Sequence, residues 1–392
     1  MNIFESVTIS SYLAVKEIWR SRGRFFLVSL VIALITLLVL FIAALGEGLG
    51  NGNREYISRL NAQLIVYQAK SDLLIQASRL SRDRLNAIRR VEGVADAGML
   101  GTANATLAVD GNLQPLKVAL LGVEPGHTGE PPVIAGRQFS TANAREVIID
   151  RNTALRSRLS VDDTLTLRVT QGTDDRFYDL RVVGVTSSQQ YSLQPSIFTP
   201  FNNWDRVRPK SEAEVDVSNP VANVILVRLV DPAQVEAVSR RLVSQVNRIE
   251  TATLSAAIEA LPGYTAQQST LNTQGGFSLF IGVLVIGGFF QIQILQKVAQ
   301  IGVLKAIGVG NPLVAAAAVL QIVITTVVGV AIGSLLTFLF SLTFPPTIPI
   351  VFNGTTSTIA VAALLLIGPL GGLVSIRYAV RIEPLKALGL AS

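Results

Sequence analysis

The chain has 392 residues, of which 49% are hydrophobic and only 15% are charged, and its formal net charge is +6. This composition excludes an ordinary soluble globular domain and predicts a protein that is integral to a membrane. The sequence has no cysteine, which excludes disulfides, cysteine-based metal sites and thiol catalysis.

The positive charge lies beside the apolar segments of the chain. Between residues 46 and 275, basic and acidic residues occur in equal numbers, so the net charge does not indicate a nucleic-acid partner. The excess lies instead on three short flanks at 16–24, 297–305 and 377–386. Basic residues that border transmembrane helices stay on the cytosolic side, so these flanks and both termini are predicted to be cytosolic.

Four apolar segments are long enough to cross a bilayer as helices. The expected spans are 25–45, 276–296, 312–340 and 359–376. The first span is too long for a signal peptide and is predicted to be a retained anchor. The other expected segments are a cytosolic amphipathic helix at 1–24, an extracytoplasmic domain at 46–275, a cytosolic segment at 297–311, an outside loop at 341–358 and a cytosolic tail at 377–392.

Two pairs of glycines recur at a spacing of four residues in the last two apolar segments. They are Gly329 with Gly333 and Gly368 with Gly372. Small residues at this spacing let two helices approach closely. The sequence leaves open whether these contacts lie within one chain or in the seam between two chains.

The fold class predicted for the whole chain is a four-helix membrane part joined to an α+β extracytoplasmic domain with two subdomains. Four glycines at the start of that domain indicate a flexible exit from the membrane: Gly46, Gly48, Gly50 and Gly52. The elements expected next are a strand at 61–67, an amphipathic helix at 81–91, and strands at 105–109 and 116–123 joined by a turn at 110–112.

A middle portion of the domain, at about 131–208, is predicted to be a mostly β insertion without helices. Its expected strands are 146–150, 164–170, 177–185 and 196–199. A strand at 223–230 follows the insertion. Asp231 and Pro232 then predict the start of a helix, because these residue types favour the cap and the first helical position.

The sequence predicts no catalytic residue and no metal site. His127 is the only histidine, and its loop-like surroundings indicate a surface residue. The acidic pairs at 162–163 and 174–175 are flanked by turn residues and are interpreted as solvated hairpin ends. No Walker-type phosphate loop occurs in the sequence, so this chain has no cofactor of its own, and ATP with Mg²⁺ is expected on a separate subunit.

The break between the second and third spans is longer than a chain reversal requires. Apolar residues at helical spacing predict a short amphipathic helix, which Gly308 and Gly310 end before the chain restarts at Pro312. Lys297 and Lys305 supply the only charges between residues 276 and 376. A turn needs only a few residues, so the length favours a docking surface, with a simple turn as the alternative.

These residues resemble a known family. The run at 300–308, Gln-Ile-Gly-Val-Leu-Lys-Ala-Ile-Gly, is similar to the coupling helix of MacB/FtsX-type, or type VII, ABC transporter permeases. The resemblance extends to the basic head at 13–27, to part of the domain at 124–169 and to the tail at 379–388. It covers nearly the whole chain, including the layout of one span before the domain and three after it.

The resemblance implies that a cytosolic ABC ATPase subunit contacts the break. The positions it assigns to this coupling contact are Lys297, Gln300, Ile301, Gly302, Leu304, Lys305, Ala306 and Gly308. It assigns a secondary cytosolic contact to Arg381, Pro384 and Leu388. Two residues depart from the family pattern, because Gln300 and Lys386 stand where glutamate is usual.

The function implied by the resemblance is that of a non-catalytic permease subunit in the prokaryotic plasma (inner) membrane. Two permease chains, identical or different, would be embedded among membrane lipids and would transmit motion from the ATPase to the outside domain. That domain would act on an extracytoplasmic substrate, in some members together with a periplasmic adaptor.

The function expected first is that of an ATP-driven exporter or an extractor of lipids or lipoproteins, and two other functions are alternatives to it. A mechanotransmitter that activates a cell-wall hydrolase is the main alternative, although the size and β insertion of the outside domain favour the exporter. A sensor subunit for antimicrobial peptides would be expected to have more than four spans. The sequence does not identify the substrate.

Overall fold

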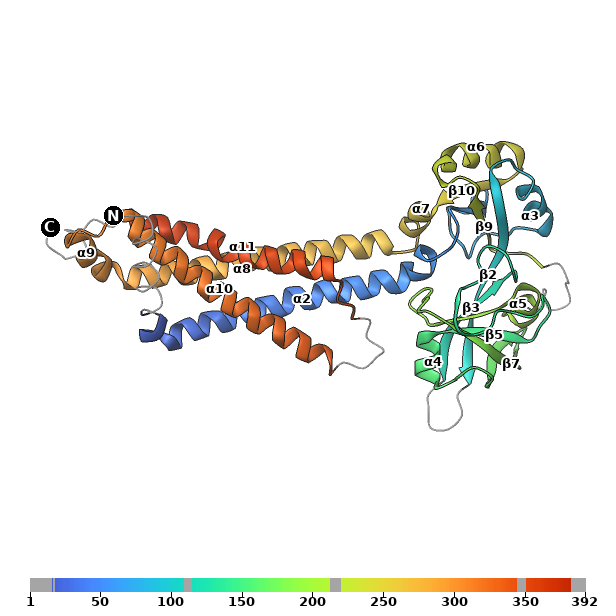
Figure 1. Cartoon of the computed structure of the whole chain (residues 1–392), viewed down its shortest axis with the longest axis horizontal. Coiled ribbons are helices and arrows are strands. Elements are labelled where there is room, and N and C mark those ends of the chain that lie inside the picture. The colour runs from blue at the N-terminus through green and yellow to red at the C-terminus, as the bar shows by residue number, and fades with distance from the viewer. Residues whose placement is uncertain (1–15, 17, 109–114, 212–219, 344–349, 382–392) are drawn as a thin grey trace. The chain divides into compact units, whose positions relative to one another are not determined.

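The computed structural model describes residues 16, 18–108, 115–211, 220–343 and 350–381. The chain forms two compact units. The first unit, which we call the membrane unit, comprises Met1–Gly48 and Gln268–Ser392, and the second, the sheet domain, comprises Leu49–Gln267. Figure 1 shows long helices in the membrane unit, and strands with short helices in the sheet domain.

The membrane unit is built from helices. They are α2 (Arg22–Ser58), α8 (Tyr264–Gln296), α9 (Val298–Ala306), α10 (Asn311–Ser341) and α11 (Gly354–Arg381). Within the described residues, four helices are long and apolar enough to span a bilayer: Arg22–Gly52, Tyr264–Gln296, Asn311–Ser341 and Gly354–Gly372. The prediction of four spans is therefore confirmed, whereas the domain boundaries expected from the sequence stay a prediction.

Helix α2 differs from the expected flexible exit. All four of its glycines between 46 and 52 are helical, and the helix continues to Ser58. At Gly46, an added Cβ would lie 3.1 Å from Cδ1 of Leu271 in α8, so the absent side chain lets α8 pack closely. Both α2 and α8 cross the boundary between the two units without interruption.

The two glycine pairs are used for packing within the chain. Gly329 and Gly333 of α10 face α2, where an added Cβ at Gly329 would lie 2.9 Å from the Ser29 carbonyl oxygen. Gly368 and Gly372 of α11 face α10, where they contact the side chains of Thr326 and Ile322. Intrachain contacts therefore account for both pairs, which resolves the alternatives that the sequence left open.

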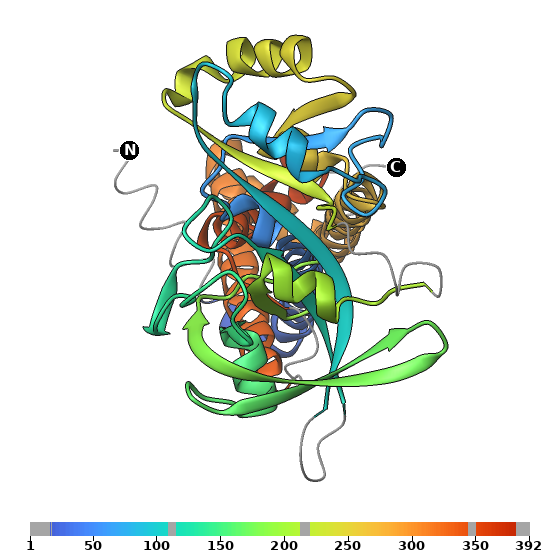
Figure 2. The ribbon, with the colours of Figure 1, turned by 90° about the vertical axis from the view of Figure 1, so that its right-hand side faces the viewer.

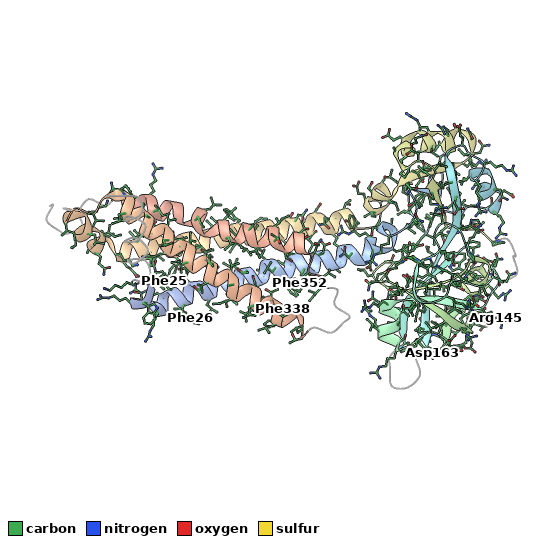
Figure 3. All side chains as sticks on the ribbon, in the orientation of Figure 1. Phe25, Phe26, Arg145, Asp163, Phe338 and Phe352 are labelled. Carbon is green, nitrogen blue, oxygen red and sulfur yellow. The ribbon has the colours of Figure 1, made fainter. Side chains whose placement is uncertain are left out.

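An apolar core joins the four long helices. It includes Val28 and Ile32 of α2, Ile286 and Phe290 of α8, Ile322 and Val330 of α10, and Leu364 and Ile367 of α11. Figure 3 shows Phe26 near the start of α2 and Phe338 near the end of α10. These two side chains are 61% and 58% exposed, as suits residues that face lipid.

In its described residues, the sheet domain has ten strands and several short helices. The strands are β1 (Leu64–Gln68), β2 (Val94–Ala108), β3 (Leu116–Val123), β4 (Val133–Gly136), β5 (Glu146–Asp150), β6 (Thr164–Gln171), β7 (Asp174–Thr186), β8 (Ser196–Pro200), β9 (Val224–Leu229) and β10 (Ile249–Thr253). The helices are α3 (Arg82–Ile88), α4 (Arg151–Ser157), α5 (Phe201–Val207), η2 (Pro232–Gln234), α6 (Val235–Gln245) and α7 (Leu254–Glu259).

All of these strands belong to one sheet. Its order is β10-β1-β9-β2-β3-β8-β5-β7-β4, and β6 pairs with both β2 and β7. Strand β8 pairs parallel with β3, and β5 pairs parallel with β7, while the other pairs are antiparallel. Figure 2 shows β2 as a long curved strand. The strands of the insertion thus continue the main sheet, and the division into two subdomains stays a prediction.

The insertion also contains two short helices that were not expected there, α4 and α5. Asp150 caps α4 by accepting a hydrogen bond of 2.7 Å from the Thr153 backbone N–H. Helix α5 is held by its buried face, which includes Phe201, Trp204 and Val207. Strands β4 and β10 were also not expected, and the turn predicted at 110–112 lies outside the described residues.

The Trp204 side chain packs against two glycines of the sheet, where no larger residue would fit. Gly101 of β2 and Gly122 of β3 are opposite each other in the register, and the Trp204 ring covers both of them. An added Cβ at Gly101 would lie 2.6 Å from three ring atoms. The indole Nε1–H also donates to the Leu120 carbonyl oxygen at 3.2 Å, so α5 is fixed to the sheet by packing and by a hydrogen bond.

Candidate functional site

Helix α9 ends in a hydrogen-bonded glycine motif. Gly308 has a φ of +98°, a left-handed conformation that glycine adopts readily. Its N–H donates to the Lys305 carbonyl oxygen at 3.0 Å, and the Val309 N–H donates to the Leu304 carbonyl oxygen at 3.0 Å. This pair of bonds is the Schellman arrangement, so the end of α9 and the direction of the following chain are both fixed.

One face of α9 packs against the membrane unit. Gly302 is buried, and the Lys305 side chain is half-buried. The Lys305 ammonium donates to the Val380 carbonyl oxygen at 2.6 Å, near the C-terminal end of α11. Carbonyls in the last turn of a helix have no partner within the helix and carry the negative end of its dipole, so they favour a cation. Lys305 therefore ties α9 to α11.

The opposite face of α9 is exposed and largely apolar. Ala299, Gln300, Val303, Ala306 and Ile307 are all exposed and follow the three- and four-residue spacing of a helix face. Val303 is 46% exposed and Ile307 is 74% exposed. We call these five residues the exposed face of α9. Its composition suits contact with an apolar surface of another protein.

The end of α8, which directly precedes α9, is held against the start of α2. Arg24 of α2 donates to the Gln296 Oε1 atom at 2.6 Å, which joins the start of α2 to the end of α8. The Lys297 ammonium lies 5.6 Å from the ring centroid of Phe25, within the range of a cation–π contact. Figure 3 shows Phe25 at the start of α2, close to the end of the helix bundle that carries α9.

The structure places one residue of the coupling segment beside the start of the segment to which the resemblance assigns a secondary cytosolic contact. The coupling segment meets the end of α11 through the bond from Lys305 to Val380, one residue before Arg381. Pro384 and Leu388 lie outside the described residues.

Among the predicted coupling residues, Gln300 and Ala306 belong to the exposed face, whereas Gly302 packs inward. Three residues of the exposed face, Ala299, Val303 and Ile307, are not among the predicted coupling residues, although their four-residue spacing can be read from the sequence.

His127 has a partner that the sequence did not reveal. Its Nδ1 atom lies 2.9 Å from Oδ1 of Asp96, and the Thr128 N–H and hydroxyl both donate to Oδ2. Burial alone would raise the pKa of Asp96, but the hydrogen bonds from His127 and Thr128 together hold it below the ordinary value. His127 itself is exposed, in agreement with its interpretation as a surface residue.

The described part of the chain was also searched for clusters of metal-ligating side chains. Within those residues, no group of three or more histidine, cysteine, aspartate or glutamate side chains is arranged to hold a metal ion. Of the acidic pairs, Asp162 forms an ion pair with Arg181 and Asp175 with Arg168, and all four side chains are exposed. The site with the most definite geometry is therefore the surface of α9.

Two family models match this sequence. The first, the MacB-like periplasmic core domain, matches residues 25–245, which is more than half of the chain. The second, the FtsX-like permease C-terminal domain, matches residues 273–384 and includes α9. The chain belongs to the MacB/FtsX-type permeases of ABC transporters.

The relatives of this permease include a protein that matches it over nearly the full length of both chains. A protein of Staphylococcus haemolyticus, whose name assigns it to a hemin transport system as permease protein HrtB, is 26% identical over 377 residues. That match covers 96% of this chain and 99% of the relative. The macrolide export ATP-binding/permease protein MacB of Agrobacterium fabrum is 26% identical over 220 residues, which cover 53% of this chain and 33% of the relative.

Two solved structures resemble the permease over about half of its length. The extracellular domain of the ABC-type transporter YknZ from Gram-positive bacteria has a TM-score of 0.36 at 14% identity and covers 49% of this chain and 100% of its own. The periplasmic region of MacB from Actinobacillus actinomycetemcomitans has a TM-score of 0.36 at 12% identity and covers 54% of this chain and 94% of its own.

The family fixes the class of protein. The chain is a membrane protein and an ABC transporter permease, and permeases of this kind work with an ATPase partner.

Proposed function

We propose that this permease is the non-catalytic membrane subunit of an ATP-driven exporter or extractor in a prokaryotic plasma membrane. Both termini and α9 would lie in the cytosol, and the sheet domain would lie outside. Support for this orientation comes from the charges. Arg20, Arg22 and Arg24 lie at or just before the start of α2, which Arg24 joins to the end of α8, and Lys297 and Lys305 lie at the start and in the last turn of α9. Basic residues that flank membrane spans are retained on the cytosolic side.

The docking site for the ATPase is assigned to the exposed face of α9. The observation that supports it is the presence of exposed Val303 and Ile307 on a helix whose orientation is fixed by the Schellman motif and by Lys305. An apolar face that is held rigidly loses little conformational freedom on binding. Gln300 adds a hydrogen-bonding group to this face, in place of the carboxylate that is usual in the family.

Movement of α9 would reach the sheet domain through α2 and α8. Helix α8 is followed directly by α9, and its end is joined to α2 by the hydrogen bond from Arg24 to Gln296. Both helices continue without interruption beyond the unit boundary. In this proposal the chain transmits work, while the partner binds and hydrolyses ATP with Mg²⁺. A second permease chain, identical or different, would complete the membrane part.

Hemin is the first substrate to test. The relative that matches over 99% of its own length is named for hemin transport. Stimulation of ATP hydrolysis by hemin in the purified assembly would support this substrate. An unchanged rate of ATP hydrolysis in the presence of hemin would exclude hemin as the substrate but would not contradict the transporter assembly. A cell-wall hydrolase that co-purified with the chain would favour the mechanotransmitter instead.

The docking assignment is tested by a double substitution, Val303→Ser with Ile307→Ser. The loss of two apolar side chains from a contact is expected to weaken capture of the ATPase about tenfold or more. The measurement is purification of the chain from its native membrane in mild detergent, followed by mass spectrometry and an ATPase assay. The partner is recognised by its Walker phosphate loop.

The matched control is Leu342→Ser. Leu342 is 69% exposed and, like Ile307, is the cap residue at a helix C-terminus, but it lies at the other end of the membrane unit. This variant is expected to retain the ATPase. Equal retention by the double variant would contradict docking at α9, and failure to find any ATPase with the unaltered chain would contradict the proposed function as a whole.

A further inference from the structure

The loop between β7 and β8 bonds to the main chain of α2 within the helix. In a regular α-helix, the Tyr56 N–H would donate to the carbonyl oxygen of Gly52, four residues earlier. In this chain the Tyr56 N–H donates to the Gln190 carbonyl oxygen at 3.2 Å, and the Gly52 carbonyl oxygen accepts from the Leu193 N–H at 3.0 Å. The same loop therefore engages both partners of one helical hydrogen bond, and all four residues belong to the sheet domain.

The loop reaches α2 through a two-residue turn, Ser192 and Leu193. The flanking residues, Tyr191 and Gln194, exchange two main-chain hydrogen bonds of 3.1 and 3.0 Å. Ser192 has a φ of +50°, and Leu193 has a φ of +62°. Turns with positive φ at both central positions favour Asn-Gly, and a bulky residue such as leucine rarely adopts this conformation. The turn is therefore strained, and its contacts with α2 hold it in place.

Gly52 allows the turn to approach the helix. A Cβ added at Gly52 would lie 2.6 Å from Cδ2 of Leu193 and 3.2 Å from Oε1 of Gln190. A Cβ added at Gly50, in the same stretch of α2, would have nothing within 4 Å. The missing side chain of Gly52 thus has a role in this contact that Gly50 does not share.

Two charged side chains at the end of α2 also hold the loop. The Glu55 carboxylate accepts from the Ser188 hydroxyl at 2.9 Å and from the Gln190 N–H at 3.2 Å. Arg59 forms an ion pair with Glu55 at 3.1 Å and donates to the Ser188 carbonyl oxygen at 2.7 Å. The loop begins where β7 ends and stops where β8 begins. A change in α2 at this point would therefore act directly on the main chain that joins two strands of the sheet.

We propose that residues 187–194 form a latch with two states. In the latched state, which is the one observed, the turn engages Gly52 and Tyr56 and keeps its left-handed conformation. In the released state, the Gly52 carbonyl and the Tyr56 N–H pair with each other, and the turn relaxes to negative φ. Latching adds the bonds to Glu55 and Arg59, while release regularises α2 and relieves the turn, so each state has its own stabilising contribution.

The latch makes the connection between β7 and β8 respond to the state of α2. Only the statement that movement of α9 drives this response rests on the proposed function, because exchange between the two states requires no ATPase.

The test is amide hydrogen exchange of the full chain in detergent, without any ATPase, read by mass spectrometry. Gly52→Ala should favour the released state, because its methyl group displaces Leu193 and Gln190 from α2. Exchange at 187–194 is expected to rise about fivefold or more, while exchange of α2 at 53–58 stays the same or falls. Gly50→Ala is the matched control, since it raises the helix preference equally but touches nothing, and it should change exchange in the loop by less than about twofold.

Two substitutions in the turn test the latch from the other side. Leu193→Pro removes the N–H that bonds Gly52 and holds φ at about −65°, so exchange at 187–194 should rise about tenfold or more while 53–58 stays protected. Ser192→Asn should have the opposite effect and slow exchange in the loop about threefold, because asparagine accepts positive φ several times more readily. Ser192 is exposed, so this variant keeps the proposal testable even if the others fail to fold.

A joint rise of exchange at 53–58 and 187–194 would overturn the proposal, since the loop would then only support the end of α2. Unchanged exchange of the loop in Gly52→Ala, or an equal change in Gly50→Ala, would also overturn it, as would a loop that Ser192→Asn does not slow. If the loop alone responded as expected but the α9 substitutions left the ATPase bound, the result would support the latch and contradict the proposed function.

Discussion

The sheet domain and the membrane unit use glycine for opposite purposes. In the sheet domain, Gly101 and Gly122 leave room for a large side chain, the ring of Trp204. In the membrane unit, Gly287 of α8 leaves room for main chain, since an added Cβ would lie 2.7 Å from the Gly371 carbonyl oxygen in α11. The first arrangement buries apolar surface, and the second brings two helix backbones together.

The difference follows from the surrounding solvent. In water, removal of a tryptophan ring from solvent drives folding, so space in a core is best filled by large side chains. Lipid tails are as apolar as leucine, so helices in a bilayer gain no such advantage from apolar contact alone. Close approach through small residues then becomes the main source of packing energy, and the positions that need it differ between the two units.

The largest effect is expected from Trp204→Ala in the sheet domain. Loss of a buried aromatic side chain from a core costs about 3–5 kcal/mol. The measurement is thermal unfolding of the full chain in detergent, with proteolysis reporting the sheet domain. Trp19 is 78% exposed, so Trp19→Ala is the matched control and should leave the unfolding temperature unchanged. Similar melting of both variants would contradict the role given to Trp204.

Gly287→Ala should destabilise the membrane unit, because its Cβ forces α8 away from the Gly371 carbonyl. Overpacking of this kind costs about 1–3 kcal/mol. The adjacent residue provides a sharp control, since Gly288 has nothing within 4 Å of an added Cβ. Thermal unfolding in detergent should separate the two variants, with Gly288→Ala unchanged or slightly more stable. Equal behaviour would mean that α8 and α11 do not depend on this approach.

Lys305→Met keeps most of the side-chain length but removes the bond to the Val380 carbonyl oxygen. Loss of a charged hydrogen bond at this half-buried position is expected to cost about 1–2 kcal/mol locally. Amide exchange should increase in α9 and at the end of α11, with the sheet domain unaffected. Lys305→Glu should have a larger effect and uncouple the ATPase without unfolding the membrane unit. If both variants showed unchanged amide exchange in α9 and α11 and unchanged coupling to the ATPase, Lys305 would have no role in the candidate site.

The smallest expected effect is on how the stability of the sheet domain changes with pH. The pKa of Asp96 is lower in the folded chain than its ordinary value, so its carboxylate stabilises the fold above the ordinary aspartate pKa. This contribution, which solvent screening keeps small at a partly exposed carboxyl, should begin to disappear as the pH falls to about 4 and be lost below the folded pKa. Thermal unfolding of Asp96→Asn against pH should lack this part of the acid transition; an unchanged pH profile would contradict the assignment.

Strands and helices with their own local signal were predictable from the sequence. The strands at 116–123 and 146–150 agree with β3 and β5 residue for residue, because apolar runs between turn residues define them. Helices α4 and α5 have seven residues each, too few for a helical period to be evident. Strand β10 was missed because its sequence, Ile-Glu-Thr-Ala-Thr, has little apolar character, and it forms by pairing with β1.

The helix that carries the candidate site was predictable in position but not in orientation. The sequence indicated where α9 lies and where Gly308 ends it. It did not indicate which face is exposed, because Lys305 is positioned by Val380, which lies 75 residues further along the chain. The glycine pairs left a choice between intrachain and interchain contact for the same reason. Contacts between distant segments require the folded structure.

The glycines within α2 have a mechanical consequence. Each glycine lowers the stability of a helix interior by about 1 kcal/mol relative to alanine, so the four of them weaken one short stretch by about 3–4 kcal/mol. This stretch, at 46–52, lies where α2 passes from one unit into the other. Under torsional load, α2 would yield there before it yields along its Leu- and Ile-rich part. If movement passes from α9 to the sheet domain as proposed, this stretch is where α2 would be expected to deform first.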